Sequence, residues 1–221
     1  MHVNKVKTIS VMQLGLEIER SLVNFTKSDS KTSLMLTGGS SARIFYEKYL
    51  RAVFERTDMS KIDIFMSDER CVSEDDENSN YKLITQALFS NDDCQKINLH
   101  SYGVDETMPA SAVEEYSNLL PDVLDILLLS MGEDGHFASI FPGSDSVFEN
   151  EKKVIYTRGP KFPEDRITIT PKIVRRAKKV YVMALGNKKY LKIKDIFLDP
   201  ADIKSFPARL LLGSTWVTTC N

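Results

Sequence analysis

Short apolar runs alternate with longer segments of helical period along most of this chain. The apolar runs of strand length lie at 33–37, 62–66, 125–130 and 180–186. Apolar residues recur at helical spacing in the segments 10–25, 42–56, 80–89 and 110–120. Nearly continuous apolar strands separated by helices are typical of a parallel sheet covered by helices on both faces. The alternation therefore predicts an α/β fold with a mostly parallel sheet.

Nothing in the sequence divides the chain into separate units. The 221 residues contain no internal repeat and no linker rich in Gly, Ser or Pro, and this length is enough to bury a sizeable core. We therefore expect one domain over residues 1–221. Two further strand-length runs lie at 153–157 and 166–170, and the polar loops 73–79 and 158–165 are candidate surface lids.

Charge and cysteine content exclude several classes of protein. Lys and Arg number 29 against 31 Asp and Glu, a net charge of -2, so no field of one sign favours nucleic acid or a membrane as a partner. Cys71, Cys94 and Cys220 are far apart and odd in number, which argues against a disulfide framework and a zinc site. Residues 1–10 show no apolar core of a signal peptide. We expect a cytoplasmic protein that holds no metal.

Polar residues follow the predicted strands, at the ends where ligands bind in open α/β sheets. The first such segment is "TGGSS" (37–41), which leads into a helix. Its glycines would place the N–H groups of Gly39, Ser40 and Ser41 at a helix start, where an anion is favoured. The segment matches neither a P-loop nor a GxGxxG fingerprint. A plain turn with a serine N-cap explains it equally well.

The next strand ends in "MSDERCV" (66–72). If the alternation of the strand continues, Asp68 and Arg70 both face the crevice. One would then meet hydroxyl groups or take a proton, and the other would meet an anion. A solvated charged loop is the alternative. Asn80 begins the following helix, either as a cap or as a ligand contact.

The strand 125–130 runs into "SMGEDGHFASIFPGS" (130–144). The glycines permit backbone conformations that other residues avoid. Asp134 stands two positions before His136 and can accept a hydrogen bond that fixes the orientation and tautomer of the imidazole. Taken alone, the segment fits a catalytic histidine and a structural one equally well. For His100 we expect no catalytic role.

Together these segments resemble a known family, the 6-phosphogluconolactonases, within the superfamily of glucosamine-6-phosphate isomerases and deaminases. The matching motifs are "LTGGSSARIFY", "FMSDERCVSEDDENSNY", "DILLLSMGEDGHFASIFPGS", "RITITPKIVRRAKKVYVMALGNKK" and "FPARLL". They cover about residues 33–212, and their shared order makes the resemblance specific. Two segments depart from the family pattern. "TGGSS" replaces a serine-glycine-glycine-serine-threonine-proline loop, and "LLLGSTWVTTCN" lacks the acidic, alanine-rich closing segment of the family.

The resemblance implies a Rossmann-like α/β sandwich and a reaction. The reaction is hydrolysis of 6-phospho-D-glucono-1,5-lactone to 6-phospho-D-gluconate, in the oxidative branch of the pentose phosphate pathway, with no cofactor or metal. By analogy with the DGH segment of the family, His136 is the general base that activates water and Asp134 orients it. Asp68 is the third catalytic candidate. A sugar phosphate is the expected partner. We expect a monomer, with a dimer as the alternative.

The resemblance also implies where the 6-phosphate binds. The 6-phosphate would be held by Gly39, Ser40, Arg166 and Lys189. The full set of expected substrate and phosphate contacts is Gly38, Gly39, Ser40, Ser41, Arg70, Arg166 and Lys189. Arg166 opens "RITIT" and Lys189 closes "LGNKK", at the positions of the anion-binding arginine and lysine of the family. Without the resemblance, a solvated surface position would be the simpler interpretation of both. The developing oxyanion is met either by backbone N–H groups of the glycine turns or by Arg70.

Two rival functions share part of this pattern. The isomerases and deaminases of the superfamily resemble the chain in the glycine loop and in DGH, but they carry Asp-Glu-Tyr in place of "DER". They also carry a glutamate five positions after the histidine, where this chain has Phe141. A phenylalanine cannot transfer a proton, which favours the lactonase. A non-catalytic sugar-phosphate sensor would keep the phosphate contacts but could lose His136 or Asp134, and both are present.

Overall fold

A seven-stranded parallel sheet forms the centre of the protein in the computed structural model, which describes residues 7–25, 31–89, 97–104, 109–198 and 201–218. In hydrogen-bonded order its strands are β1 (Lys7–Ile9), β10 (Thr215–Thr218), β9 (Lys179–Ala184), β6 (Ile126–Ser130), β2 (Thr32–Leu36), β3 (Ile62–Met66) and β5 (Asn98–Leu99). All neighbouring pairs are parallel. This confirms the α/β fold with a mostly parallel sheet, and the four apolar runs that predicted it form β2, β3, β6 and β9.

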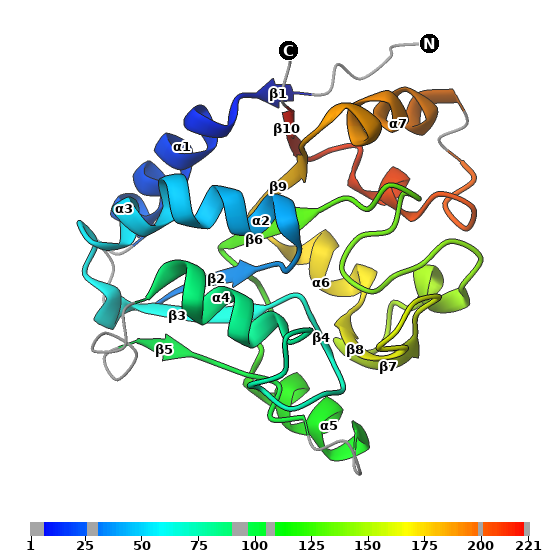
Figure 1. Ribbon diagram of the computed structural model, residues 1–221, viewed down its shortest axis with the longest axis horizontal. Coiled ribbons are helices and arrows are strands. Elements are labelled where there is room, and N and C mark those ends of the chain that lie inside the picture. The colour runs from blue at the N-terminus through cyan, green and yellow to red at the C-terminus, as the bar shows by residue number, and fades with distance from the viewer. Residues whose placement is uncertain (1–6, 26–30, 90–96, 105–108, 199–200, 219–221) are drawn as a thin grey trace.

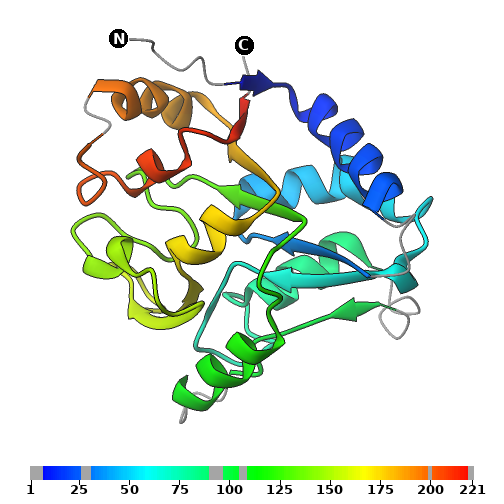
Figure 2. The ribbon, with the colours of Figure 1, turned by 180° about the vertical axis from the view of Figure 1, so that it is seen from behind.

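Helices connect these strands and cover the sheet. They are α1 (Val11–Phe25), α2 (Ser40–Phe45), α3 (Arg51–Phe54), α4 (Asn80–Leu88), α5 (Pro109–Leu119), α6 (Pro171–Arg176) and α7 (Asn187–Leu198), with short 3-10 helices at Met59–Lys61, Asp145–Phe148 and Pro207–Leu211. A π-helical turn, Tyr46–Leu50, joins α2 to α3, so the single helix predicted for 42–56 changes its winding midway. In Figure 1, α2 and α4 lie in front of the strands, whereas α6 comes forward in the reverse view of Figure 2.

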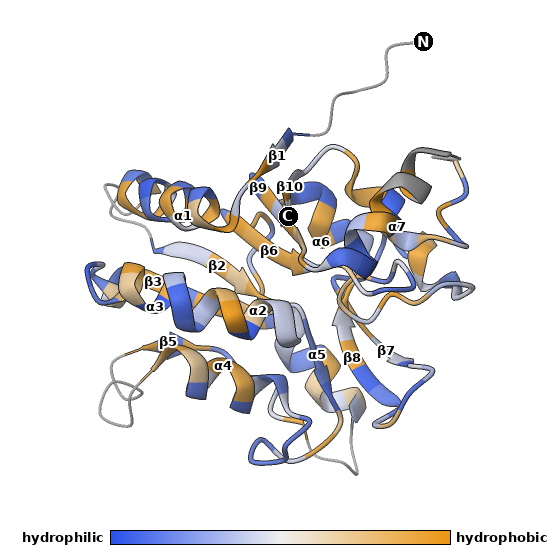
Figure 3. Ribbon diagram, turned by 45° about the horizontal axis from the view of Figure 1, so that its top comes forward, coloured by the Kyte–Doolittle hydropathy of each residue, from blue (hydrophilic) through white to orange (hydrophobic). Residues whose placement is uncertain are grey.

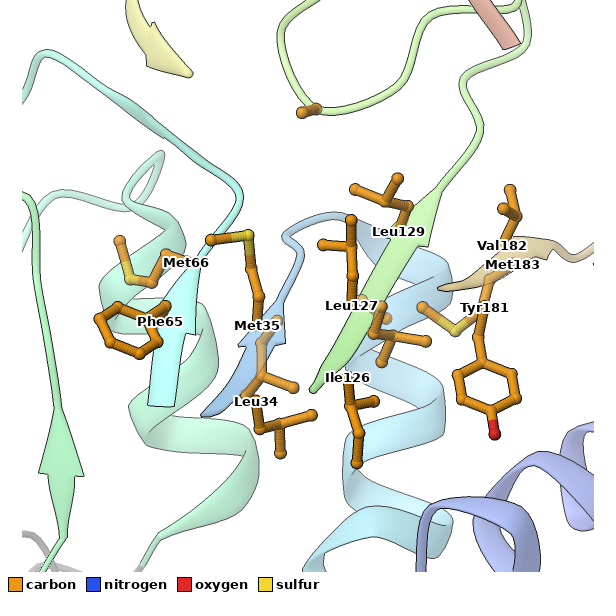
Figure 4. Packing of buried hydrophobic residues seen from close by; sticks show 14 of the residues in the cluster. Leu34, Met35, Phe65, Met66, Ile126, Leu127, Leu129, Tyr181, Val182 and Met183 are labelled. Carbon is orange, nitrogen blue, oxygen red and sulfur yellow. The ribbon is translucent and has the colours of Figure 1, made fainter. Parts of the chain in front are cut away.

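The core lies on both faces of the central strands. All five residues of β2 are buried, and so are the first four of β6, so these strands show no alternation. In contrast, α1 is amphipathic and alternates hydrophobic with hydrophilic residues along its length (Figure 3). Figure 4 shows side chains of four strands packed side by side: Leu34, Met35, Phe65, Met66, Ile126, Leu127, Leu129, Tyr181, Val182 and Met183. Burial on both faces is what removes the polar positions from the strand sequences.

A second, three-stranded sheet departs from the predicted alternation. It has the order β4 (Asp68–Arg70), β8 (Asp165–Ile169), β7 (Val154–Arg158), and both pairings are antiparallel. The runs 153–157 and 166–170 therefore do not join the parallel sheet. They have no helix between them, only a short connection, and such a connection suits an antiparallel hairpin. The segment "DER" is itself a short strand rather than a loop.

The first and last described strands, β1 and β10, pair with each other at one edge of the parallel sheet. The sequence patterns did not predict β1 or β10, and β10 lies between β1 and β9.

In the described ranges Cys71 forms no disulfide, whereas Cys94 and Cys220 lie outside them. The same ranges hold no group of three or more His, Cys, Asp or Glu side chains placed to bind a metal ion. No helix in the described part is long and apolar enough to cross a membrane.

The strand order reverses between β2 and β6. From β2 the chain continues outward through β3 and β5, and from β6 it continues in the opposite direction through β9 and β10. The loops that leave the carboxyl ends of β2 and β6 therefore diverge and leave a crevice between them, the usual ligand site of such sheets.

Candidate active site

A cleft of about 460 Å³ lies at this reversal point, and its lining residues come from the ends of the parallel strands and from the small sheet. Figure 1 shows β4, β7 and β8 of the small sheet beside the parallel sheet. Three walls of the cleft come from segments that follow β2, β6 and β9, and the fourth comes from β4 and β8. Its lining residues are Thr37, Gly38, Gly39, Ser40, Asp68, Arg70, Asn80, Ser130, Met131, Gly132, Glu133, Asp134, His136, Ala138, Ser139, Phe141, Pro160, Lys161, Arg166 and Lys189. Nine of the ten predicted site residues are in this lining, and Ser41 is the exception.

The turn after β6 holds Asp134 and His136 together. The amide of Gly132 donates to the carbonyl of His136 at 2.8 Å, and Gly135 closes the turn with a φ of +89°, a conformation that favours glycine. Asp134 Oδ1 lies 2.5 Å from His136 Nδ1 and also accepts the backbone N–H of His136 at 3.2 Å. The predicted Asp134–His136 pair is therefore formed.

The charge state of Asp134 decides which ring nitrogen is available. Burial raises the pKa of Asp134, but the hydrogen bond and the charge of His136 outweigh it, and the net result is a pKa of about 2. At neutral pH the carboxylate is ionised and can only accept a hydrogen bond. The nitrogen that faces it, Nδ1, therefore carries the proton. The lone pair of Nε2 is then left to act as a base.

Two residues shape the surroundings of the imidazole. A Cβ atom on Gly132 would lie 2.2 Å from both His136 Nδ1 and Cε1, so the ring rests directly against the backbone of this glycine. The ring of Phe141 lies on another side, with its centroid 5.1 Å from that of the imidazole and a 47° angle between the planes. Phe141 thus forms an apolar wall beside the imidazole of His136.

Contacts with Tyr46 and Asn80 hold the glycine loop after β2 in place. The hydroxyl of the buried Tyr46 accepts the N–H of Thr37 at 3.0 Å and donates to the carbonyl of Thr37 at 2.7 Å. Gly38 leaves no room for a side chain, because a Cβ there would lie 1.9 Å from Asn80 Oδ1. Gly39 has a φ of +94° and is the N-cap of α2. These contacts fix the loop against the cleft.

Lys189 reaches the cleft from the first turn of α7. Its Nζ donates to Ser41 Oγ at 3.1 Å and to Ser130 Oγ at 3.4 Å. Burial lowers the pKa of Lys189, and the charge of Glu133 opposes this effect. Ser41, which we predicted to touch the ligand, is buried and instead supports the ammonium group.

Arg70 and Arg166 face each other on adjacent strands, in direct register between β4 and β8. The side chain of Arg70 donates to the carbonyl of Asn78, and Arg166 donates to the carbonyl of Lys161 at 3.3 Å. The Nε atoms of both are buried without a hydrogen-bond partner, and neither guanidinium forms an ion pair with any of the residues the structure describes. Burial lowers the pKa of Arg166, and the charge of Arg70 lowers it further. The charges of Asp68 and Glu69 act in the opposite direction. Two guanidinium groups in a cleft, each with a buried Nε that lacks a partner, are suited to bind an anion.

Asp68 and Glu69 point to opposite sides of β4, as the predicted alternation requires. Asp68 lines the cleft and accepts the hydroxyl of Ser67 at 2.9 Å and that of Ser139 at 2.7 Å. Glu69 lies outside the cleft lining and accepts hydrogen bonds from the start of α4. Burial raises the pKa of Glu69, and the N–H donors around it act in the opposite direction.

Sequence reasoning missed several residues of the site. Ser139 and Lys161 lie in segments that it quoted, but no local signal shows that they reach the cleft. Asn80 was left open between a cap and a ligand contact. Ser79 is in fact the N-cap of α4, through its bond with the N–H of Lys82, and Asn80 lines the cleft. Of the two candidate lid loops, 158–165 contributes Pro160 and Lys161 to the lining, and 73–79 contributes nothing.

Comparison with known proteins places this arrangement in a family. A family model described as glucosamine-6-phosphate isomerases/6-phosphogluconolactonase matches residues 7–219. The 6-phosphogluconolactonase of Borreliella burgdorferi is 34% identical over 191 residues, which are 83% of this chain and 80% of that protein. The 6-phosphogluconolactonase 3 of Saccharomyces cerevisiae is 35% identical over 77% of this chain and 73% of its own length.

Solved structures show the same fold. A 6-phosphogluconolactonase structure from Shewanella baltica matches with a TM-score of 0.85 and 22% identity, over 99% of this chain and 100% of that chain. One from Thermotoga maritima matches with a TM-score of 0.77 and 24% identity, over 96% and 98%.

Proposed function

The chain belongs to the family of glucosamine-6-phosphate isomerases and 6-phosphogluconolactonases, and we propose that it hydrolyses 6-phospho-D-glucono-1,5-lactone with His136 as the general base. The lactonase activity is that of its relatives in bacteria and yeast. The observation that carries the choice of activity is the pair Asp134–His136 with Phe141 beside it. A base is present, and the glutamate of the isomerases is replaced by an apolar ring.

The proposed reaction begins with a water molecule at His136 Nε2. The imidazole takes a proton from the water, and the resulting hydroxide adds to the lactone carbonyl to give a tetrahedral oxyanion. When the carbonyl re-forms, the bond between the carbonyl carbon and the ring oxygen breaks. The proton on the imidazolium passes to that oxygen, which becomes a hydroxyl group of 6-phospho-D-gluconate. Asp134 keeps Nδ1 protonated and stabilises the imidazolium, in the manner of the acid member of a catalytic triad.

The remaining cleft residues bind the substrate in this proposal. Arg166 and Lys189 hold the 6-phosphate, together with the backbone of Gly38, Gly39 and Ser40. This role is supported by the unpaired guanidinium of Arg166 and by the position of Lys189 above the glycine loop.

Two roles on β4 complete the proposal. Asp68 accepts a sugar hydroxyl, since the hydroxyls of Ser67 and Ser139 already hold its carboxylate in place. Arg70 contacts either the phosphate or the developing oxyanion. Four further properties stay predictions: that the enzyme is a monomer, that it is cytoplasmic, that it forms a single domain, and that it needs neither metal nor cofactor.

The direct test is an assay on freshly prepared 6-phosphogluconolactone. The purified protein is expected to raise the rate of acid release well above spontaneous hydrolysis, and to release no ammonia from glucosamine 6-phosphate. Adding a chelator should leave the rate unchanged. A rate equal to the spontaneous one would contradict the lactonase assignment. Release of ammonia would instead assign the protein to the isomerases and deaminases of the superfamily.

Substituting Gly132 by alanine should reduce activity without unfolding the protein. The new Cβ would overlap the imidazole and also lie 2.8 Å from Asp134 Oδ1, so the geometry of the Asp134–His136 pair must change. We expect a fall in kcat of about tenfold to a hundredfold, since a displacement of about 1 Å at a reacting group has costs of that order. Gly213→Ala is the control, because a Cβ at Gly213 meets nothing within 4 Å. Equal kcat values for the two variants would show that the contact with Gly132 does not position the base.

A further inference from the structure

The cleft keeps two like-charged side chains side by side. Arg70 and Arg166 are paired in register, and their mutual repulsion favours a structure in which one of them swings away. No carboxylate among the described residues forms an ion pair with either guanidinium. Something other than an ion pair must therefore keep Arg70 in the cleft wall.

The contacts of Glu69 supply this restraint. Glu69 Oε1 accepts the backbone N–H of Arg70 at 2.7 Å and that of Asn80 at 2.8 Å. Glu69 Oε2 accepts the backbone N–H of Tyr81 at 2.8 Å and the hydroxyl of Ser79 at 3.1 Å. Glu69 is only 4% exposed, so water does not compete strongly for these bonds. One side chain thus ties the strand β4 to the first turn of α4.

Two further hydrogen bonds also connect β4 to the residues at the start of α4. Asn80 Nδ2 donates to the carbonyl of Asp68 at 2.9 Å, and the guanidinium of Arg70 donates to the carbonyl of Asn78. Asp68, Arg70 and Asn80 all line the cleft, whereas Glu69 does not. Releasing Glu69 would therefore loosen one wall of the cleft and leave the Asp134–His136 turn after β6 in place.

We propose that Glu69 is a positioning residue for substrate affinity, which holds Arg70 and Asn80 in the cleft wall through its four hydrogen bonds. The proposal rests on the proposed function, because it concerns the same cleft. It assigns Glu69 to binding rather than to the chemical step.

The test compares Glu69→Gln with Glu69→Asp. Each oxygen of the Glu69 carboxylate accepts two hydrogen bonds, but only one of the two terminal atoms of a glutamine amide is an acceptor. In either orientation the NH2 group of Gln therefore faces two of the groups that donate to Glu69. We expect Glu69→Gln to raise KM about tenfold or more, the effect of losing one hydrogen bond to a charged group, and to change kcat by less than about threefold. The dissociation constant of 6-phosphogluconate, measured by calorimetry, should rise by the same factor. Glu69→Asp keeps the charge but is shorter, and it should fall between Glu69→Gln and the wild type.

Asp125→Asn is the matched control. Asp125 is also a largely buried carboxylate, and it accepts the N–H and the hydroxyl of Ser33, both at 2.9 Å, but it precedes β6 at the opposite end of the sheet from the cleft. A loss of folded protein lowers the apparent kcat and leaves KM unchanged, which is the result expected for Asp125→Asn.

Three outcomes separate the possibilities. Unchanged KM and unchanged affinity for 6-phosphogluconate in Glu69→Gln would overturn the proposal. If that variant does not fold, the same result in Glu69→Asp would overturn it. A wild-type protein that fails to hydrolyse the lactone would instead contradict the proposed function.

Discussion

Replacing His136 with alanine is expected to lower kcat for the lactone by about a hundredfold to ten-thousandfold, the usual contribution of a general base. KM should change little, because the phosphate contacts lie elsewhere in the cleft. The physical reason is that Nε2 is the ring nitrogen with a free lone pair, since Nδ1 is bound to Asp134 at 2.5 Å. Initial rates, corrected for spontaneous hydrolysis, measure both constants.

The chain offers a matched control for this substitution. His100 also lies beside an aspartate, with Nε2 3.3 Å from Asp63 Oδ1, and it stacks on Phe65 outside the cleft lining. His100→Ala should therefore keep the wild-type kcat. An active His136→Ala variant would remove the proposed base while leaving the lactonase assignment intact.

Replacing Arg166 with alanine is expected to raise KM about tenfold to a hundredfold, because a hydrogen bond to a charged group contributes about 1.5–3 kcal/mol. The change in kcat should be small if the phosphate is held equally in the ground state and the transition state. The affinity for 6-phosphogluconate should fall by the same factor. Lys189→Ala should act in the same direction, since its ammonium group is the second buried cation assigned to the phosphate.

The stability of Arg166→Ala distinguishes binding from folding. Arg166 is 7% exposed, its Nε has no hydrogen-bond partner, and Arg70 faces it on the adjacent strand. Burial and the charge of Arg70 disfavour the charged form of Arg166, whereas the charges of Asp68 and Glu69 favour it. Since these effects oppose each other, the melting temperature of the substrate-free variant should stay close to that of the wild type. Arg175→Ala, at an exposed position of α6, is the control for KM. A rise in KM that comes with a large loss of stability would argue for a structural role of Arg166.

The parallel sheet could be predicted because its strands are buried on both faces. The segments 34–36 of β2 and 126–129 of β6 are therefore apolar at every position, and the apolar stripe on α1 indicates a helix. The second sheet could not be predicted in the same way. β4 pairs with β8 across almost a hundred residues, and nothing in the local sequence "DER" reports that pairing. β1 and β10 are short, with three and four residues, and their burial depends on neighbours far along the chain.

Some residues of the candidate site could likewise be predicted from the sequence, and others could not. The strand-end rule located the loops that hold Gly39, Asp134 and Lys189, because chain direction alone decides where a parallel strand ends. The alternation argument placed Asp68 and Arg70 on one side of β4 and was confirmed. Glu69 read as one more charge in a polar segment, since its role is visible only once the start of α4 is folded against it.

The phenol of Tyr46 has a consequence for how the glycine loop meets its ligand. Loops rich in glycine lose much conformational entropy when they become ordered. Here the phenol, fixed in the π-helical turn, bonds both backbone groups of Thr37 at the base of the loop. The loop is therefore ordered when the protein folds. If it binds the phosphate as proposed, the entropy loss of ordering it no longer counts against the affinity.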